Sequence, residues 1–367
     1  MTSIPNVKKM LDREIENVVK RMMRSKKKNI RNDLVFPNDF QSFNKMIGFP
    51  LNRNLNKPQK MTDYQIPYDD AINKFHKVIF NKSRKIGATE AVIRSIAMNV
   101  FDRYKGHDIM IVAGNKLRIA TDILKRLDEL FRDKPGTGYS FKEPGKDGNV
   151  WHYDKLIRRR TFGNIPEIEF TNDTRVMAYA ASINEKSQSF RGTDDVACIF
   201  LSEAANTGMK KDQPIMNALL LNLANRDDGD FILESTPNGR RGFYFNYWMM
   251  MMEILSKQFN MKITEHQQLV DHLLYLWKNK KKIPFDVDWF PLMIDYTEGI
   301  KAGVISEKFI KEQKRDPNLD FNQEYCCKFT STYTQAIDVS NLQTLPPEKG
   351  EVESQDLLSL VGKKSVA

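Results

Sequence analysis

The fold is decided by the stretch KVIFNKSRKIGATEAVIRSIA, residues 77–97. Its first five residues are mostly apolar and β-branched or aromatic, a composition that indicates a strand. From Ala88 onward the apolar residues recur at helical spacing, and a short polar loop, Lys82–Thr89, lies between the two segments. A strand, a loop and a helix in this order leave backbone N–H groups free at the start of the helix, where they can bind phosphate. The stretch therefore predicts a phosphate-binding loop.

This loop departs from the usual pattern G-x-x-x-x-G-K-[ST]. Gly87 and Thr89 match it, whereas Lys82 stands at the first glycine and Ala88 at the lysine. The Thr89 hydroxyl is placed to bind Mg²⁺, as in the standard loop. We expect a nucleotide to be bound by the whole loop, which consists of Lys82, Ser83, Arg84, Lys85, Ile86, Gly87, Ala88 and Thr89.

Polar residues before and after the loop extend this prediction. Gln65 precedes the first strand, and a glutamine amide can pair with the N6 and N7 edge of adenine, although it can equally be a surface residue. The apolar run 196–201 (VACIFL) indicates a buried central strand, and Ser202 and Glu203 follow it directly. Glu203 is a candidate base for the attacking water. Ser202 stands where an aspartate would ordinarily hold Mg²⁺, and it can do so only as a neutral acceptor.

A second strand-like segment ends in a polar turn. The sequence FILESTPNG, residues 231–239, runs from apolar residues into hydroxyl and amide side chains. Such groups at a strand end can sense a γ-phosphate, while proline and glycine fix the turn. An ordinary turn is the alternative interpretation. The candidate residues are Ser235, Thr236, Pro237 and Asn238.

Strand-like and helix-like segments alternate through the middle of the chain. Short apolar runs such as DIMIVAG, residues 108–114, are followed by helical stretches, which predicts βαβ units and a parallel sheet. We expect four regions: a basic amphipathic N-terminal arm and irregular linker (1–62), an α/β core (63–262), a mostly helical subdomain (263–330) and a polar tail (331–367).

Composition restricts the class of protein. Lysine and arginine exceed aspartate and glutamate, which gives a formal net charge of +10 and favours a polyanionic partner or ligand. The three cysteines, Cys198, Cys326 and Cys327, cannot form a disulfide framework or a four-ligand zinc site. No uncharged stretch approaches the roughly 20 residues that a membrane span needs. We expect a protein that does not cross a membrane, in a reducing compartment.

Taken in order, the segments DYQ, SRKIGAT, RG, FLSE and STPNG resemble the ATPase domain of the large terminases of tailed viruses, the motors that push DNA into empty capsids. A later pattern, Phe321, Gln323, Glu324, Tyr325 and Phe329, resembles the end of that domain. The resemblance covers residues 63–330. It implies an ASCE-type P-loop NTPase fold, with a mostly parallel central β-sheet flanked by helices and a small helical lid subdomain.

The resemblance also implies roles for individual residues. It implies that Gln65 recognises adenine, that Thr89 binds magnesium and that Glu203 is the catalytic glutamate. Ser202 again replaces an aspartate. In this family the phosphate-binding cation often leaves its usual position, so Lys82, with Arg84 or Lys85, is the expected substitute.

Two further roles concern movement and assembly. Ser235, Thr236 and Pro237 match the motif that couples hydrolysis to DNA movement. Arg191 matches an arginine that reaches the nucleotide of a neighbouring subunit, where it would stabilise charge on the transferring phosphoryl group. A surface pairing of Arg191 with Asp194 or Asp195 is the alternative.

The implied ligands and partners are ATP, Mg²⁺, double-stranded DNA, a homo-oligomeric ring, the viral portal and the small terminase subunit. The implied location is the cytoplasm of the infected host cell, transiently at the procapsid portal. Full-length terminases carry a nuclease domain after the residues matched here, with carboxylates that hold two metals. We expect no nuclease activity from the short polar tail. Three interpretations stay open: the chain is truncated, it is split from a nuclease domain, or it is paired with a separate nuclease polypeptide as a further partner.

Two other functions stay open at this point. A helicase-like DNA translocase also has a glutamine before the loop and an acidic strand end, but it needs a second motor lobe. A non-catalytic P-loop scaffold that binds nucleic acid would explain Ala88 and Ser202, whereas Thr89, Glu203 and the STPNG turn favour an active enzyme.

Overall fold

The computed structural model describes residues 37, 39–52, 54–114, 117–132, 141–142, 150–151, 156–181, 195–207, 212–281 and 289–330. The N-terminal arm and the polar tail expected from the sequence lie outside these residues. Arg191 lies outside them as well.

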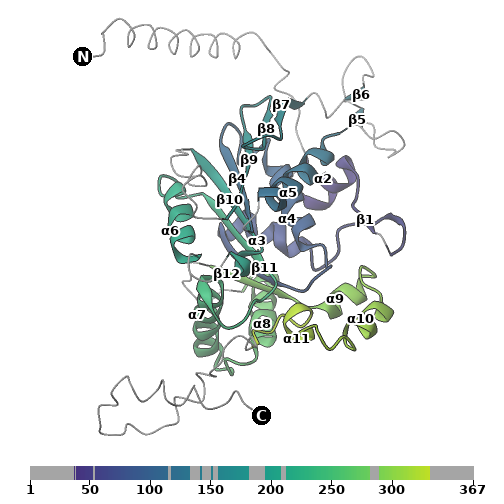
Figure 1. The fold of residues 1–367 in the computed structure, drawn as a ribbon, viewed down its shortest axis with the longest axis vertical. Helices are drawn as coiled ribbons and strands as arrows, with labels where there is room; N and C mark the ends of the chain where they lie inside the picture. Colours follow the sequence, from purple (N-terminus) through teal and green to yellow (C-terminus); the bar gives the residue numbers. More distant parts are fainter. Residues whose placement is uncertain are drawn as a thin grey trace, which may run out of the picture.

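An eight-stranded sheet forms the centre of the molecule, in the order β12-β3-β11-β10-β4-β9-β8-β7 (Figure 1). The strands from β12 to β9 pair in parallel, whereas β8 and β7 continue the sheet as antiparallel strands. The predicted α/β class with a mostly parallel sheet is confirmed. The strands of this sheet are β3 (Lys77–Lys82), β4 (Asp108–Ala113), β7 (Ile157–Thr161), β8 (Glu167–Phe170), β9 (Arg175–Tyr179), β10 (Val196–Ser202), β11 (Asp230–Ser235) and β12 (Phe290–Ile294).

The strand order brings the predicted site segments to one edge of the sheet. Strand β11 lies between β3, which precedes the phosphate-binding loop, and β10, which ends in Ser202. Because the three strands are parallel and in register, with Ser202 beside Glu234 and Ser235 beside Asn81, their carboxyl ends meet at the same edge. One strand, β11, thus separates the strand before the loop from the strand before Glu203, as in the ASCE arrangement that the resemblance implied.

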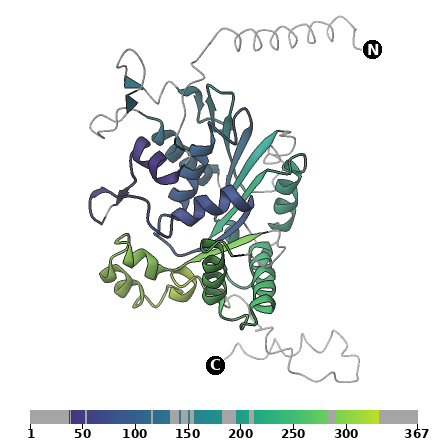
Figure 2. The same cartoon turned by 180° about the vertical axis from the view of Figure 1, so that it is seen from behind.

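Helices cover both faces of the sheet, as the two opposite views show (Figures 1 and 2). Helices α2 to α5 pack on one face, and α6 to α8 on the other, while the short helices α9 to α11 lie beyond the end of β12. The helices are α2 (Phe40–Ile47), α3 (Ile66–Phe75), α4 (Ala88–Asn99), α5 (Leu117–Leu130), the 3₁₀ helix η3 (Ala204–Asn206), α6 (Asp212–Asn222), α7 (Gly242–Phe259), α8 (His266–Lys278), α9 (Tyr296–Lys301), α10 (Glu307–Gln313) and α11 (Phe321–Glu324).

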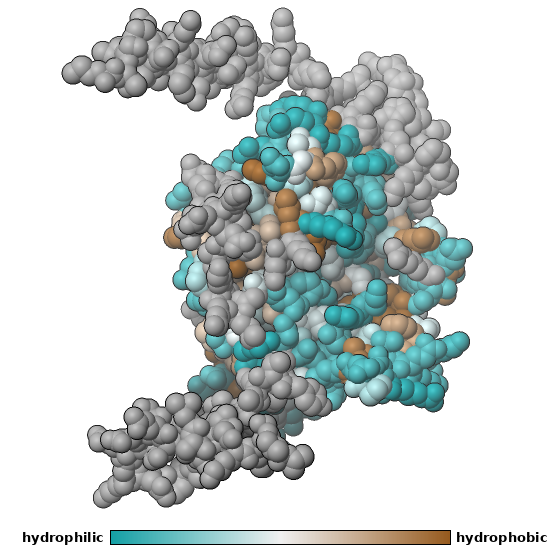
Figure 3. Space-filling view, in the orientation of Figure 1, coloured by the Kyte–Doolittle hydropathy of each residue, from teal (hydrophilic) through white to brown (hydrophobic). Residues whose placement is uncertain are grey.

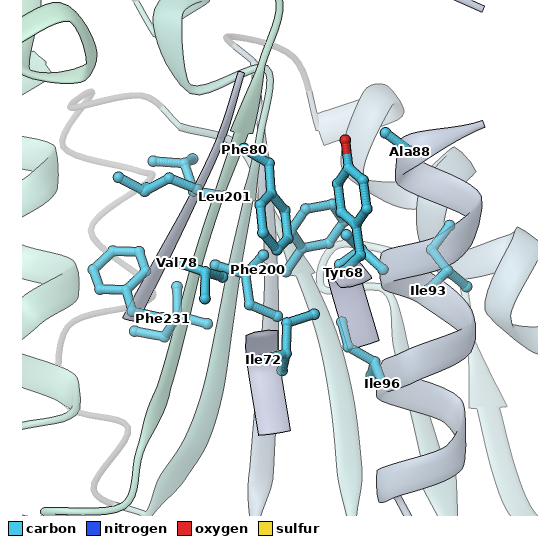
Figure 4. Close-up of a cluster of buried hydrophobic side chains, with 14 of the residues drawn as sticks. Tyr68, Ile72, Val78, Phe80, Ala88, Ile93, Ile96, Phe200, Leu201 and Phe231 are labelled. Atoms are coloured by element: carbon cyan, nitrogen blue, oxygen red, sulfur yellow. The ribbon is translucent and has the colours of Figure 1, made fainter. Parts of the chain in front are cut away.

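The main core lies between the sheet and helices α3 and α4 (Figure 4). Tyr68 of α3 and Phe80 of β3 are both fully buried, with ring centroids 4.3 Å apart. In α4 almost every residue is buried, which is expected for a helix enclosed by a sheet and three other helices. This enclosure fixes the start of α4, and with it the loop, relative to the sheet.

Two segments differ from the simple regions expected from the sequence. The linker expected before residue 63 contains α2 and a hairpin of β1 (Leu51–Asn52) and β2 (Lys57–Pro58). The hairpin is attached to the C-terminal helices, since the Gln59 amide donates to the Ala302 carbonyl at 2.8 Å. The range 263–330, expected to be mostly helical, contributes β12 to the central sheet. Strand β12 has only five residues, too few for a clear period-2 pattern.

The remaining short strands are β5 (Phe141–Lys142) and β6 (Val150–Trp151), which pair antiparallel with each other. The visible surface is largely hydrophilic, with apolar residues scattered over it (Figure 3). Within the described part of the chain, no helix has the length and apolar character to cross a bilayer.

Candidate nucleotide-binding site

The loop predicted to bind phosphate joins the end of β3 to the first turn of α4. Gly87 precedes the helix in the left-handed conformation, with φ of 74°, and a Cβ atom there would lie 2.8 Å from Nε2 of Gln65. Both constraints require glycine. The loop is held from outside by backbone bonds: the Ser83 N–H donates to the Ile294 carbonyl at 2.8 Å, and the Arg84 N–H donates to the Glu324 carbonyl at 3.0 Å.

Gln65 lies against this loop, and it is buried. Its Oε1 accepts hydrogen bonds from both the N–H and the hydroxyl of Thr62, each at 3.0 Å, and its Nε2 donates to the Gly87 carbonyl at 3.0 Å. Both acceptor positions of the amide oxygen are therefore used, and one amide hydrogen is left. In this conformation Gln65 can donate to a base, but it cannot also accept from the adenine N6 amino group.

Ile86 and Ala88, two other loop residues expected at the site, are buried in the core. The Ile86 carbonyl accepts a hydrogen bond from the Tyr64 hydroxyl at 2.6 Å. Their side chains pack under the loop, so they can contribute only main-chain groups to a ligand.

A carboxylate that the sequence reasoning missed lies at the centre of the site. Glu234, on β11, is fully buried and accepts a hydrogen bond from the Thr89 hydroxyl at 2.8 Å. The Ser202 hydroxyl donates to the same carboxylate at 3.2 Å. Burial raises the pKa of Glu234, while the Lys82 ammonium and the two hydroxyl donors act in the opposite direction. The signal in the sequence was an acid directly after the apolar residues FIL of a strand-like segment, since a buried acid needs partners.

Lys82 is the buried cation of the site. Its Nζ lies 2.9 Å from Oε1 of Glu203, and its side chain is only 9% exposed. Burial by itself lowers the pKa of Lys82, but the negative charges of Glu234 and Glu203 outweigh it and the net pKa is raised. The single positive charge of Lys82 therefore acts on two carboxylates, Glu234 on β11 and Glu203 directly after β10.

Glu203 begins the segment after β10 in a strained conformation. Its φ of 54° and ψ of 43° are left-handed, a region that costs a non-glycine residue about 1 kcal/mol or more. One carboxylate oxygen pairs with Lys82, and the other accepts from the Asn206 amide at 3.2 Å. The side chain is one-third exposed, so water has access to it. These are properties expected of a base that orients water.

The polar turn after β11 is bonded to the segment that carries Glu203. The Ser235 hydroxyl accepts from the Ala205 N–H at 3.1 Å, and the Asn238 amide donates to the Asn206 side chain at 2.7 Å. Pro237 is buried. The hydroxyl oxygen of Thr236 is also buried, and it has no hydrogen-bond partner among the described residues.

The other two loop cations, Arg84 and Lys85, are exposed, whereas Lys82 is buried. Arg84 forms an ion pair with Glu324, whose pKa is raised by burial and lowered by this arginine. Lys85 is exposed and has a φ of 65°. In addition, the Gly239 N–H donates to the Gln323 side chain at 2.8 Å. The segment FNQEY thus contacts both the loop and the polar turn.

A magnesium ion at this site would be held by few protein groups. Within the described part of the chain, no three or more histidine, cysteine, aspartate or glutamate residues are grouped so as to hold a metal. Mg²⁺ usually takes one or two protein oxygens and completes its shell with phosphate and water, so the hydroxyl of Thr89 beside a carboxylate fits this ion.

Comparisons with known proteins add a likeness of fold. No protein-family model matches the sequence, and no curated protein sequence matches it. The structure is similar to the ATPase domain of the large terminase of Thermus phage P74-26, with 18% identity, 81% of this chain and 100% of that chain covered, and a TM-score of 0.45. It is also similar to the large terminase of another thermophilic bacteriophage, in complex with ATP-gamma-S, with 11% identity, 73% of this chain and 53% of that chain covered, and a TM-score of 0.45. At these scores, the fold assignment depends on the strand order and the loop geometry.

Proposed function

We propose that this chain is a magnesium-dependent ATPase, the motor subunit of a viral large terminase that translocates double-stranded DNA into a procapsid. The observation that carries the proposal is the meeting of Thr89, Glu234, Lys82 and Glu203 at the carboxyl edge of the parallel sheet, directly under a phosphate-binding loop. Open parallel sheets bind ligands at this edge. A hydroxyl, a buried cation and a strained, water-accessible glutamate are the groups that phosphoryl transfer to water requires.

ATP binding would rearrange the ion pair of Lys82. The phosphates carry more negative charge than one carboxylate, so they compete with Glu203 for the ammonium group. Transfer of Lys82 to the phosphates leaves the Glu203 carboxylate free to accept a hydrogen bond from the attacking water. Mg²⁺, when bound, would neutralise charge on the phosphate oxygens.

The hydrogen bonds around the polar turn support a role for this turn in coupling hydrolysis to movement. Glu203 is hydrogen-bonded to Asn206, and Asn206 to Asn238. The next residue, Gly239, is hydrogen-bonded to Gln323. The buried Thr236 hydroxyl is an available donor close to these hydrogen bonds. We propose that loss of the γ-phosphate is transmitted along these contacts to the C-terminal helices.

The wider assignments are part of the same proposal. We expect a homo-oligomeric ring in which Arg191 of one subunit reaches the nucleotide of the next, acting with the viral portal and the small terminase subunit. The net charge of +10 suits a DNA partner. The site of action would be the cytoplasm of the infected host cell, at the procapsid portal.

Steady-state ATP hydrolysis, with and without double-stranded DNA, tests the proposal in the wild type and in Glu203→Gln. We expect the substitution to reduce turnover by at least about 100-fold, in the range of general acid–base catalysis. Glu253→Gln, which changes an exposed acid of α7, is the matched control and should leave turnover unchanged. Unchanged turnover in Glu203→Gln would remove the catalytic assignment, and no turnover in the wild type would favour the non-catalytic scaffold.

The ring can be tested separately. Hydrolysis per subunit should rise with protein concentration as the ring assembles, and Arg191→Ala should abolish that rise. A rate per subunit that is independent of concentration in the wild type would contradict the role of Arg191.

A further inference from the structure

The carboxylate expected for the magnesium site is missing from the end of β10, where Ser202 stands. Strands β10 and β11 pair in parallel with Ser202 directly beside Glu234. Neighbouring strands lie about 4.8 Å apart, and side chains at paired positions point to the same face of the sheet. A glutamate has one methylene more than an aspartate, which lets it reach toward the neighbouring position.

The hydrogen bonds show where the Glu234 carboxylate lies. Oε1 and Oε2 are 2.8 and 3.1 Å from the Thr89 hydroxyl oxygen, and Oε2 is 3.2 Å from that of Ser202. A threonine hydroxyl has one hydrogen and two lone pairs. With its hydrogen donated to Glu234, the Thr89 oxygen has its lone pairs free for a cation.

The surroundings of this carboxylate hold more negative than positive charge. Glu234 is fully buried, and an acid in such a place is costly unless it is paired. Lys82 supplies one positive charge, but it is also paired with Glu203 at 2.9 Å. Two carboxylates therefore share one ammonium group, and a divalent cation beside Thr89 would balance the remaining charge.

We propose that Glu234 provides the carboxylate of the magnesium site, in place of an acid at position 202. In this arrangement Ser202 only donates a hydrogen bond that orients Glu234. The inference depends on the proposed function, because it concerns the metal that accompanies the nucleotide. It adds a residue on β11 to the metal site that the sequence assigned to Thr89 and Ser202 alone.

The test measures metal binding rather than turnover. Free Mn²⁺ is followed by electron paramagnetic resonance while it is titrated into the full chain with a non-hydrolysable ATP analogue. We expect Glu234→Gln to weaken Mn²⁺ binding by roughly 10- to 100-fold, the range found when a carboxylate that supports a metal ligand is removed. Ser202→Ala should weaken it only a few-fold. Binding of the analogue in the presence of EDTA should be the same in all three proteins.

A control separates metal binding from loss of stability. Asp230→Asn changes the other buried acid of β11, at the opposite end of the strand, and should lower the unfolding temperature without weakening Mn²⁺ binding. If Glu234→Gln does not fold, Glu234→Asp keeps the charge and shortens the side chain, and should show a similar loss of affinity. Recovery of Mn²⁺ affinity in Ser202→Asp/Glu234→Gln would further support the inference.

Three results would overturn the inference. The first is unchanged Mn²⁺ affinity in Glu234→Gln, or in Glu234→Asp where that variant is used. The second is an equal loss of affinity in Ser202→Ala. In both of these cases the proposed function would still stand, provided that the wild type binds the ATP analogue. The third is a wild type that binds no nucleotide with or without metal, and that result would remove the proposed function and the inference together.

Discussion

Replacement of Lys82 by methionine should destabilise the protein mainly through Glu234. The lysine side chain is 9% exposed, and its one charge acts on two acids, Glu203, which is one-third exposed, and Glu234, which is fully buried. Water can solvate Glu203 after the substitution, but it cannot reach Glu234. Lys82 is ion-paired with Glu203 and acts on Glu234 through its charge. Loss of that charge beside a fully buried acid should approach the roughly 3–5 kcal/mol that removal of one partner of a buried ion pair costs. We expect a loss of this size at pH 8.

The pH dependence follows from the same carboxylate. Without the lysine, the pKa of Glu234 in the folded state rises further above its unfolded value of about 4. When the pKa of an acid is raised in the folded state, the free energy of unfolding of the protein falls as the pH increases through that pKa, because the unfolded state releases the proton more readily. Lys82→Met should therefore be closer to the wild type at pH 5 than at pH 8.

Urea denaturation followed by circular dichroism, at both pH values, measures these free energies of unfolding. In Lys82→Met/Glu234→Gln the buried charge is absent, so the loss relative to Glu234→Gln should fall to about 1.5 kcal/mol or less. Lys82→Met/Glu203→Gln should not recover in this way. A loss below about 1 kcal/mol in Lys82→Met, or equal recovery in both double variants, would refute the reasoning.

Two other predictions concern the loop and the helix before it. Gly87→Ala should lose about 1–2 kcal/mol of stability because of its left-handed φ, and it should also lose nucleotide affinity because the new Cβ would displace Gln65. Gly106 has a φ of 82° and open space around it, so Gly106→Ala should lose stability but not nucleotide affinity. Denaturation measures the stability, and titration with an ATP analogue measures the affinity. Burial raises the pKa of Asp69 to about 6, so Asp69→Asn should be more stable than the wild type by up to about 3 kcal/mol at pH 7, with no difference below pH 4. If the free energies of unfolding of Asp69→Asn and the wild type changed in parallel between pH 4 and 7, the assignment to Asp69 would be contradicted.

Much of the fold could be predicted from local sequence patterns. The strand before the loop, the helix after it and the buried strand before Glu203 each have a periodicity or an apolar run that depends only on neighbouring residues. The Arg-rich strand β7 and the five-residue β12 were not predicted, because their pairing partners rather than their own residues make them strands.

The site likewise has features that local sequence patterns predict and features that only the fold creates. The sequence by itself determined which residues stand at strand ends and at the start of α4, since motif spacing is a property of the chain. Thr89 and Glu203 were proposed as site residues on that basis. Only the tertiary structure decided which of them meet. The β10–β11 register placed Glu234 beside Ser202, and the Thr89 hydroxyl donates to it. The order β3-β11-β10 brought Lys82, at the end of β3, against Glu203. Such contacts depend on the order and register of strands that are far apart in the chain, which no local pattern encodes.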